Sequence, residues 1–298
     1  MAILAKRPVW MEKPNWFVQG LKVLVMIFIV IVMLYPFINI VMVSFSDPNK
    51  YTSGDLLLWP EGFTIDSYKL ILSGNIVPRA LLVSIGVTVV GTLFSMVMTV
   101  TIAYGLSYTR RVPGSKFMLW VVLASMLFSA GIIPTYLLVR GLHLIDSYWS
   151  LILPGAISAF NLVVVRSFFM NIPEELLDAA RIDGCGELRI LARLVLPLSK
   201  AVLAVIALFY GVGYWNAFFG AMLYLNDTSK WPIQLVLQQY VLQAEPLPGT
   251  VIENPQVKIT PETVRMTVLV LATVPILLVY PFLQRFFTSG VLTGAIKG

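Results

Sequence analysis

Long runs without any ionisable side chain divide the chain, and six of them are long enough to cross a membrane. A charge at the centre of a bilayer is costly, whereas about 20 consecutive apolar residues span its hydrocarbon core. Each run therefore predicts one transmembrane helix. The six predicted spans are residues 23–46, 80–109, 117–139, 147–165, 201–226 and 266–284.

Prolines interrupt four of these runs. A proline removes a backbone donor and clashes with the preceding turn, so we expect it to kink or end a helix and to leave carbonyl groups free. The prolines concerned are Pro36, Pro134, Pro154, Pro275 and Pro281. Another apolar run, residues 232–243, is too short to span and predicts an interfacial or re-entrant helix.

Composition agrees with a membrane location. Hydrophobic residues make up 58% of the 298 residues and charged residues 12%, and the mean hydropathy is +0.85. These values exceed what the surface of a soluble domain tolerates. We therefore expect an all-α, polytopic membrane protein with six transmembrane helices. Cys185 is the only cysteine, so no internal disulfide can form.

The distribution of positive charge predicts the orientation. With the amino terminus in the cytoplasm, 14 of the 21 Lys and Arg residues lie on the cytoplasmic side and seven lie outside, as the positive-inside rule requires. Both termini are then cytoplasmic. The net charge of +6 reflects topology, and we expect no nucleic-acid partner. Two long loops, residues 47–79 and 227–265, would offer a partner surface outside the membrane.

A charged segment, residues 173–197, lies between the fourth and fifth runs and predicts two short cytoplasmic helices. Asn171 and Glu174 have capping-box spacing before the first helix. Gly184 should end that helix in a left-handed conformation. The second helix should run from about Glu187 until Pro197 ends it.

One side of the first predicted helix suits docking into a groove on another protein. Leu176, Ala179, Ala180 and Asp183 share this side, and the two alanines would let a partner approach closely. The carboxylates of Glu174, Asp178 and Asp183 would meet basic partner residues. The alternative is an ordinary solvated amphipathic helix.

The order Asp178-Ala179-Ala180, Ile182-Asp183-Gly184 and Leu196-Pro197 resembles the cytoplasmic "EAA" loop of ABC-importer permease subunits. Asp178 stands where Glu is usual, and Cys185 where Ala is usual. Asp is one methylene shorter, so its reach toward a partner differs.

Three further features resemble particular branches of that family. Trp215-Asn216 and the terminal Gly-Ala-Ile-Lys-Gly resemble the carbohydrate-uptake branch, in particular the second permease of maltose-type transporters. Residues 280–284 and the FSDPNKY loop resemble the subgroup for complex oligosaccharides.

The resemblance implies an ATP-driven mechanism whose ATP is bound elsewhere. No GxxxxGK[ST] phosphate loop occurs in the chain, so we expect no enzyme activity, no catalytic or metal site and no cofactor on this chain. ATP and magnesium would bind to two ATP-binding-cassette subunits. A homologous second permease, an extracytoplasmic solute-binding protein and membrane lipid complete the expected partners. The residues expected to contact the ATPase are Glu174, Glu175, Asp178, Ala179, Ala180, Asp183, Gly184, Gly294, Lys297 and Gly298.

The resemblance also implies a division of the chain and a substrate class. Residues 1–78 would form the amino-terminal tail, first span and first outer loop. Residues 79–287 would form the importer core with the EAA loop at 171–200, and residues 288–298 a cytoplasmic tail. The location would be a prokaryotic inner membrane, and the substrates oligosaccharides, with uronate-containing alginate or pectin fragments as candidates.

The fifth run carries the candidate sugar contacts, Tyr210, Tyr214, Trp215 and Asn216. Aromatic faces and an amide suit the apolar and hydroxyl faces of a sugar. Packing around the small Gly211 and Gly213 is the alternative.

Two other function classes remain as alternatives. An ion-coupled secondary transporter usually keeps ionisable residues within its spans, and the six runs contain none. An intramembrane hydrolase needs a base for its nucleophile, and His143 is the only histidine.

Overall fold

The computed structural model describes residues 16–51, 57–107, 112–128, 130–243 and 261–295, and across these ranges all regular elements are helices. The prediction of an all-α protein is confirmed. The chain divides into two compact units, one made of residues 1–67 and 255–270 and the other of residues 68–254 and 271–298.

The first unit contains helix α1 (Trp16–Ser44) and the start of α14 (Pro261–Ala295). Helix α1 is apolar on every side and exposed over most of its length, as expected for a helix that faces lipid. The helix continues past Pro36. Beyond it, Val43, Tyr51 and Leu57 form a small buried cluster.

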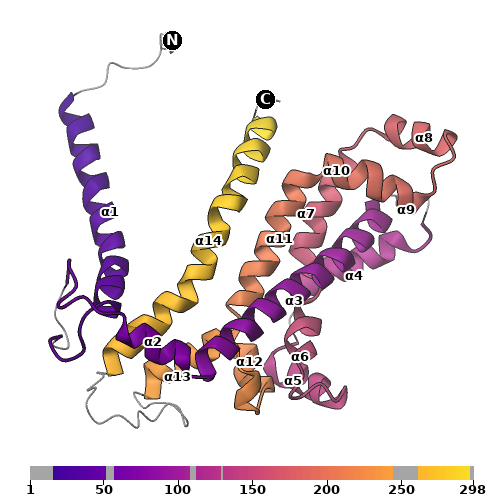
Figure 1. Ribbon diagram of the computed structural model, residues 1–298. Helices are drawn as coiled ribbons and strands as arrows, with labels where there is room; N and C mark the ends of the chain where they lie inside the picture. The colour runs from indigo at the N-terminus through magenta and orange to yellow at the C-terminus, as the bar shows by residue number, and fades with distance from the viewer. Residues whose placement is uncertain (1–15, 52–56, 108–111, 129, 244–260, 296–298) are drawn as a thin grey trace. The chain divides into compact units, whose positions relative to one another are not determined.

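The second unit is built around α3 (Ile76–Ser107), against which α7 (Ala159–Met170) and α11 (Lys200–Trp215) pack (Figure 1). Buried side chains such as Leu162, Val165 and Ile206 fill the space between these helices. The unit also receives α2 (Asp66–Ser73), which begins at the boundary.

The run 232–243 forms helix α13 (Ile233–Gln243), which packs on α3 and on α12 (Phe218–Tyr224). The backbone N–H of Ile233 donates to Ser84 Oγ on α3 at 2.8 Å. The prediction that residues 232–243 form a helix is therefore confirmed, and one face of α13 is buried against α3.

The described residues contain three helices long and apolar enough to cross a membrane, or up to five if two bent pairs each count as one span. The number of six is therefore not confirmed. The third predicted span is interrupted, since it forms α4 (Ser115–Leu127) and α5 (Ile132–Gly141). Gly131 before α5 has a φ of 82°, a conformation that no helix continues through.

The fourth predicted span is also broken, close to Pro154. Helix α6 (Trp149–Ile152) and the 3₁₀ turn η1 (Leu153–Gly155) meet α7 at a bend of 53°. The prediction that Pro154 would interrupt its helix is thus confirmed, because the proline cannot donate to the ladder.

The turn between α5 and α6 is tied to the segment that follows α12. Asp146 Oδ1 accepts hydrogen bonds from the backbone N–H groups of Asn226, at 2.7 Å, and Asp227, at 2.9 Å. These backbone donors, that of Asp227 foremost, lower the pKa of the Asp146 carboxyl. The 3₁₀ turn η3 (Thr228–Lys230) follows, and the Lys230 ammonium donates to the Asp146 carbonyl.

Candidate coupling site

The charged segment forms helix α8 (Glu174–Ile182), which lies at one end of the bundle of α3, α7 and α11 (Figure 1). Glu174 and Glu175 occupy its first turn, where carboxylates interact favourably with the helix dipole. The predicted capping box is wrong. Asn171 ends α7, and Pro173 precedes the new helix with a φ of −55° that suits a helix start.

The carboxyl end of α8 is a Schellman turn. Gly184 has a φ of 77°, and its N–H donates to the Arg181 carbonyl while the Cys185 N–H donates to the Ala180 carbonyl, both at 3.0 Å. The predicted left-handed ending at Gly184 is confirmed. Cys185 and Ala180 are half-buried against the core, so Cys185 serves here as a small packing residue.

The second helix of the segment is continuous but irregular. It consists of α9 (Glu187–Ile190), the π turn η2 (Leu191–Val195) and α10 (Leu196–Leu198). The chain then bends by 88° into α11. The predicted end at Pro197 is off by one residue. Pro197 cannot donate to the carbonyl four residues earlier, which favours irregular helix and a turn at this point.

The inner faces of both helices are anchored in the core. Leu177 of α8 and Val195 of η2 are fully buried, and Ile190 and Leu191 are nearly so. They join the buried cluster that contains Phe169 of α7. Burial of these apolar side chains holds the segment on the bundle.

The outer face of the same segment is apolar and exposed. The side chains of Ile182 and Leu188 are 86% and 80% exposed, and Leu176 is 46% exposed. Ala179 and Asp183 are also exposed, whereas Ala180 is half-buried, so only one alanine of the pair is available to a partner. Exposed apolar residues on an otherwise polar segment mark an interaction surface.

Sequence reasoning missed Ile182 and Leu188. Both lie close to the helix break at Gly184. Apolar residues next to a break in a charged segment are the sequence signal that could have identified them as contact residues.

A chain of polar contacts crosses the Schellman turn. Arg181 donates from Nη1 to Asp178 Oδ1 at 2.8 Å and from Nε to Glu187 Oε1 at 2.9 Å. The hydrogen bond to Glu187, foremost, raises the pKa of the Arg181 guanidinium. Tyr104 of α3 donates from its hydroxyl to Glu187 Oε2 at 2.5 Å.

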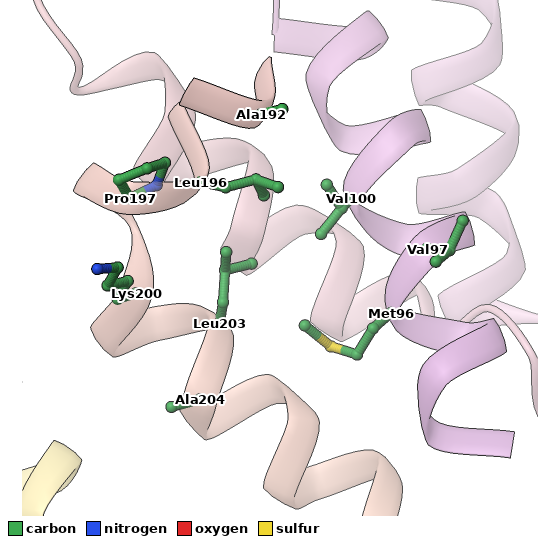
Figure 2. Close-up of a pocket in the computed structure, with 9 residues that line it drawn as sticks. All are labelled: Met96, Val97, Val100, Ala192, Leu196, Pro197, Lys200, Leu203 and Ala204. Carbon is green, nitrogen blue, oxygen red and sulfur yellow. The ribbon is translucent and has the colours of Figure 1, made fainter. Parts of the chain in front are cut away.

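An apolar groove of about 570 Å³ lies beside this segment, between α3 and the turn from α10 to α11 (Figure 2). Leu196 points toward α3, Met96 points back across the groove, and the ammonium of Lys200 points away from α3 (Figure 2). The lining offers few hydrogen-bonding groups, so the groove does not suit a sugar. Its lining residues are Met96, Val97, Val100, Ala192, Leu196, Pro197, Lys200, Leu203 and Ala204.

Comparison with known proteins identifies the family to which the chain belongs. No protein-family model matches the chain. It is 47% identical to the polygalacturonan/rhamnogalacturonan transport system permease protein YtcP of Bacillus subtilis (strain 168), over 88% of this chain and 92% of that protein. It is 46% identical to the protein LplC of the same strain, over 88% and 89%.

A solved structure agrees with these relatives. A chain of a bacterial ABC transporter involved in the import of the acidic polysaccharide alginate superposes with a TM-score of 0.87, at 30% identity, over 94% of this chain and all of that chain. The chain belongs to the permease subunits of ABC carbohydrate importers. The permease is therefore a multi-pass membrane transport subunit and not an enzyme.

Two candidate sugar contacts of the permease are engaged within the bundle. Tyr210 and Tyr214 are buried, and their hydroxyls pair with Thr99 at 2.7 Å and Ser95 at 2.8 Å on α3. Both hydroxyls are therefore engaged within the bundle, and a role of these two residues in sugar contact stays a prediction.

The other candidate residues belong to elements other than α8. Trp215 is buried, and its Nε1 has no partner in the described part of the chain. Asn216 is exposed just beyond α11. Gly294 lies in the last turns of α14, while Lys297 and Gly298 fall outside the described residues. Within the described ranges, no group of three His, Cys, Asp or Glu side chains could hold a metal ion.

Proposed function

We propose that the permease forms half of the translocation pathway of an ATP-driven importer for acidic oligosaccharides and that α8 couples it to the ATPase. The substrate class rests on the relatives. One is named for polygalacturonan and rhamnogalacturonan transport, and the similar structure belongs to an importer of alginate, an acidic polysaccharide. Polygalacturonan and alginate both consist of uronate units, so uronate-containing oligosaccharides are the common substrate.

One observation carries the coupling role: α8 presents an exposed apolar face at the end of the bundle. Leu176, Ala179 and Ile182 follow one another at three-residue spacing, so they share a side of the helix. Such a helix fits a groove on a partner. Glu174, Glu175 and Asp183 supply carboxylates around it for basic groups of the ATPase.

The remaining parts of the importer follow from this role. Two ATPase subunits would bind ATP and magnesium on the cytoplasmic side, where both termini of the permease would also lie. A second permease would complete the pathway, and a solute-binding protein would dock on the long outer loops. Gly294 and Lys297 would add a second contact to the ATPase. Trp215, with its unpartnered N–H, and Asn216 remain the proposed sugar contacts.

Coupling requires that α8 bind the open and closed ATPase states with different affinity. A contact that is equally strong in both states would transmit no free energy. The rigid connection of α8 to α7 on one side and to α9 on the other would carry the ATPase closure into the bundle.

The coupling role predicts that Ile182→Asp weakens ATPase binding by about tenfold or more, the factor that roughly 1.4 kcal/mol gives. The carboxylate would have to be desolvated in an apolar contact. Co-purification of the ATPase with the tagged permease and ATP-dependent uptake in proteoliposomes measure this effect. Leu142→Asp is the matched control, because Leu142 is 58% exposed and directly follows α5, which lies at the opposite end of the bundle from α8 (Figure 1). Normal ATPase binding by Ile182→Asp would refute the docking role of α8.

A further inference from the structure

Tyr104 connects the coupling segment to the central helix of the bundle. Its ring is buried on α3 and lies edge-on to Phe169 of α7, with the ring centroids 6.4 Å apart. Its hydroxyl donates to Glu187 Oε2 at 2.5 Å. A hydrogen bond to a carboxylate is shorter and stronger than one between neutral groups, so Glu187 is held at a defined position beside α3.

Glu187 passes this constraint on to α8. Its Oε1 accepts from Arg181 Nε at 2.9 Å, and Arg181 Nη1 donates to Asp178 Oδ1 at 2.8 Å. Arg181 thus bridges the two helices on either side of the Gly184 turn. The polar chain runs from the core of α3, through α9, to the middle of α8.

We infer that Glu187 is a positioning residue that fixes the angle of the coupling helix α8 relative to α3. This inference rests on the proposed coupling role of α8. Leu177 and Ile190 keep the segment attached, but apolar packing is not directional and leaves the angle at the glycine turn undetermined. Directional hydrogen bonds from Tyr104 and Arg181 supply what apolar packing lacks.

The groove beside the segment explains why such a constraint is needed. Between Val100 of α3 and Leu196 of α10 the groove leaves space unfilled by side chains (Figure 2). On that side, α10 is therefore not packed tightly against α3. With the polar chain broken, a push on α8 would turn the segment at Gly184 instead of moving α3.

The inference predicts a loss of coupling without a loss of assembly. Glu187→Gln removes the negative charge of the carboxylate that accepts hydrogen bonds from both Arg181 and Tyr104. Tyr104→Phe removes only the tyrosine hydroxyl. In proteoliposomes with ATPase and binding protein, we expect each variant to raise the ATP hydrolysed per sugar imported by about fivefold, the lower end of the usual range for coupling between sites. The double variant should be no worse than either single one, because both changes break the same chain.

Controls separate positioning from stability. Tyr136→Phe on α5 removes a tyrosine hydroxyl elsewhere and should leave the ratio unchanged. Thermal unfolding and ATPase co-purification should be close to wild type for both test variants. An unchanged ratio in Glu187→Gln and Tyr104→Phe would overturn the inference, and so would additive effects in the double variant.

The same experiment distinguishes this failure from failure of the proposed function. If the wild-type importer works and Ile182→Asp weakens ATPase binding as expected while Glu187→Gln couples normally, only the positioning role is refuted. If Ile182→Asp also couples normally, the coupling role of α8 itself is refuted.

Discussion

Two tyrosine hydroxyls of α11 satisfy backbone groups that the break near Pro154 leaves unpaired. Tyr214 donates to the Ile152 carbonyl at 3.2 Å, and Tyr210 accepts from the Ser158 N–H at 2.9 Å. Within a membrane each unpaired backbone group costs several kcal/mol. The interruption is therefore stable because α11 supplies the missing partners.

Gly91 on α3 makes room for the Tyr214 ring. A Cβ at position 91 would lie 2.9 Å from two ring atoms, and the hydroxyl bonds of Tyr214 prevent the ring from moving aside. We expect Gly91→Ala to destabilise the permease by about 1–3 kcal/mol, as overpacking does. Thermal unfolding in detergent measures this change.

Gly86 on the same helix provides the matched control. A Cβ there meets nothing within 4 Å, so Gly86→Ala should be neutral or stabilise the helix by up to about 1 kcal/mol. Equal effects of the two substitutions would show that the Tyr214 contact is not close in solution.

At the residue scale, the sequence predicted the conformation of individual residues better than it predicted which residues contact one another. The left-handed Gly184 followed from glycine chemistry alone. The pairing of Tyr210 with Thr99 and of Tyr214 with Ser95 did not, because residues more than 100 positions apart meet only once the helices pack.

At the scale of elements, the coupling segment depends on one backbone conformation. Gly184 has a φ of 77°, and a Cβ there would meet nothing within 4 Å. The cost of a substitution is therefore conformational rather than steric, about 1–2 kcal/mol for an ordinary residue. Asn tolerates this conformation far better than a β-branched residue does.

We therefore expect Gly184→Val to uncouple ATP hydrolysis from uptake, whereas Gly184→Asn retains most of the coupling. Valine would open the Schellman turn and change the angle between α8 and α9. The ATP hydrolysed per sugar in proteoliposomes measures the difference. Equal behaviour of the two variants, or wild-type transport by Gly184→Val, would contradict a role for the left-handed turn.

The helices were predicted well where the backbone stays helical through the apolar run and poorly for the run 117–139, which breaks at Gly131. Residues 23–46 and 80–109 correspond closely to α1 and α3. The run 117–139 contains no charge, so hydropathy alone could not reveal the break at Gly131. A hydropathy scale measures the free energy of transfer of side chains from water to lipid and contains no information on backbone conformation.

At the scale of the whole molecule, membership of the ABC importer permeases indicates that a separate ATPase supplies the driving force. The six apolar runs contain no Asp, Glu, Lys, Arg or His, and ion-coupled transporters use such residues within their spans. The family assignment and the exposed face of α8 agree with energy delivered by an ATPase.

The most direct test of this account is uptake by the reconstituted importer. Proteoliposomes containing the permease, its second permease and the ATPase, with the binding protein added outside, would be given labelled trigalacturonate. The account predicts uptake only when ATP is present on the ATPase side. An excess of unlabelled trigalacturonate should reduce uptake of the labelled sugar strongly, and an excess of maltotriose should reduce it weakly. Uptake driven by an ion gradient without ATP would contradict it.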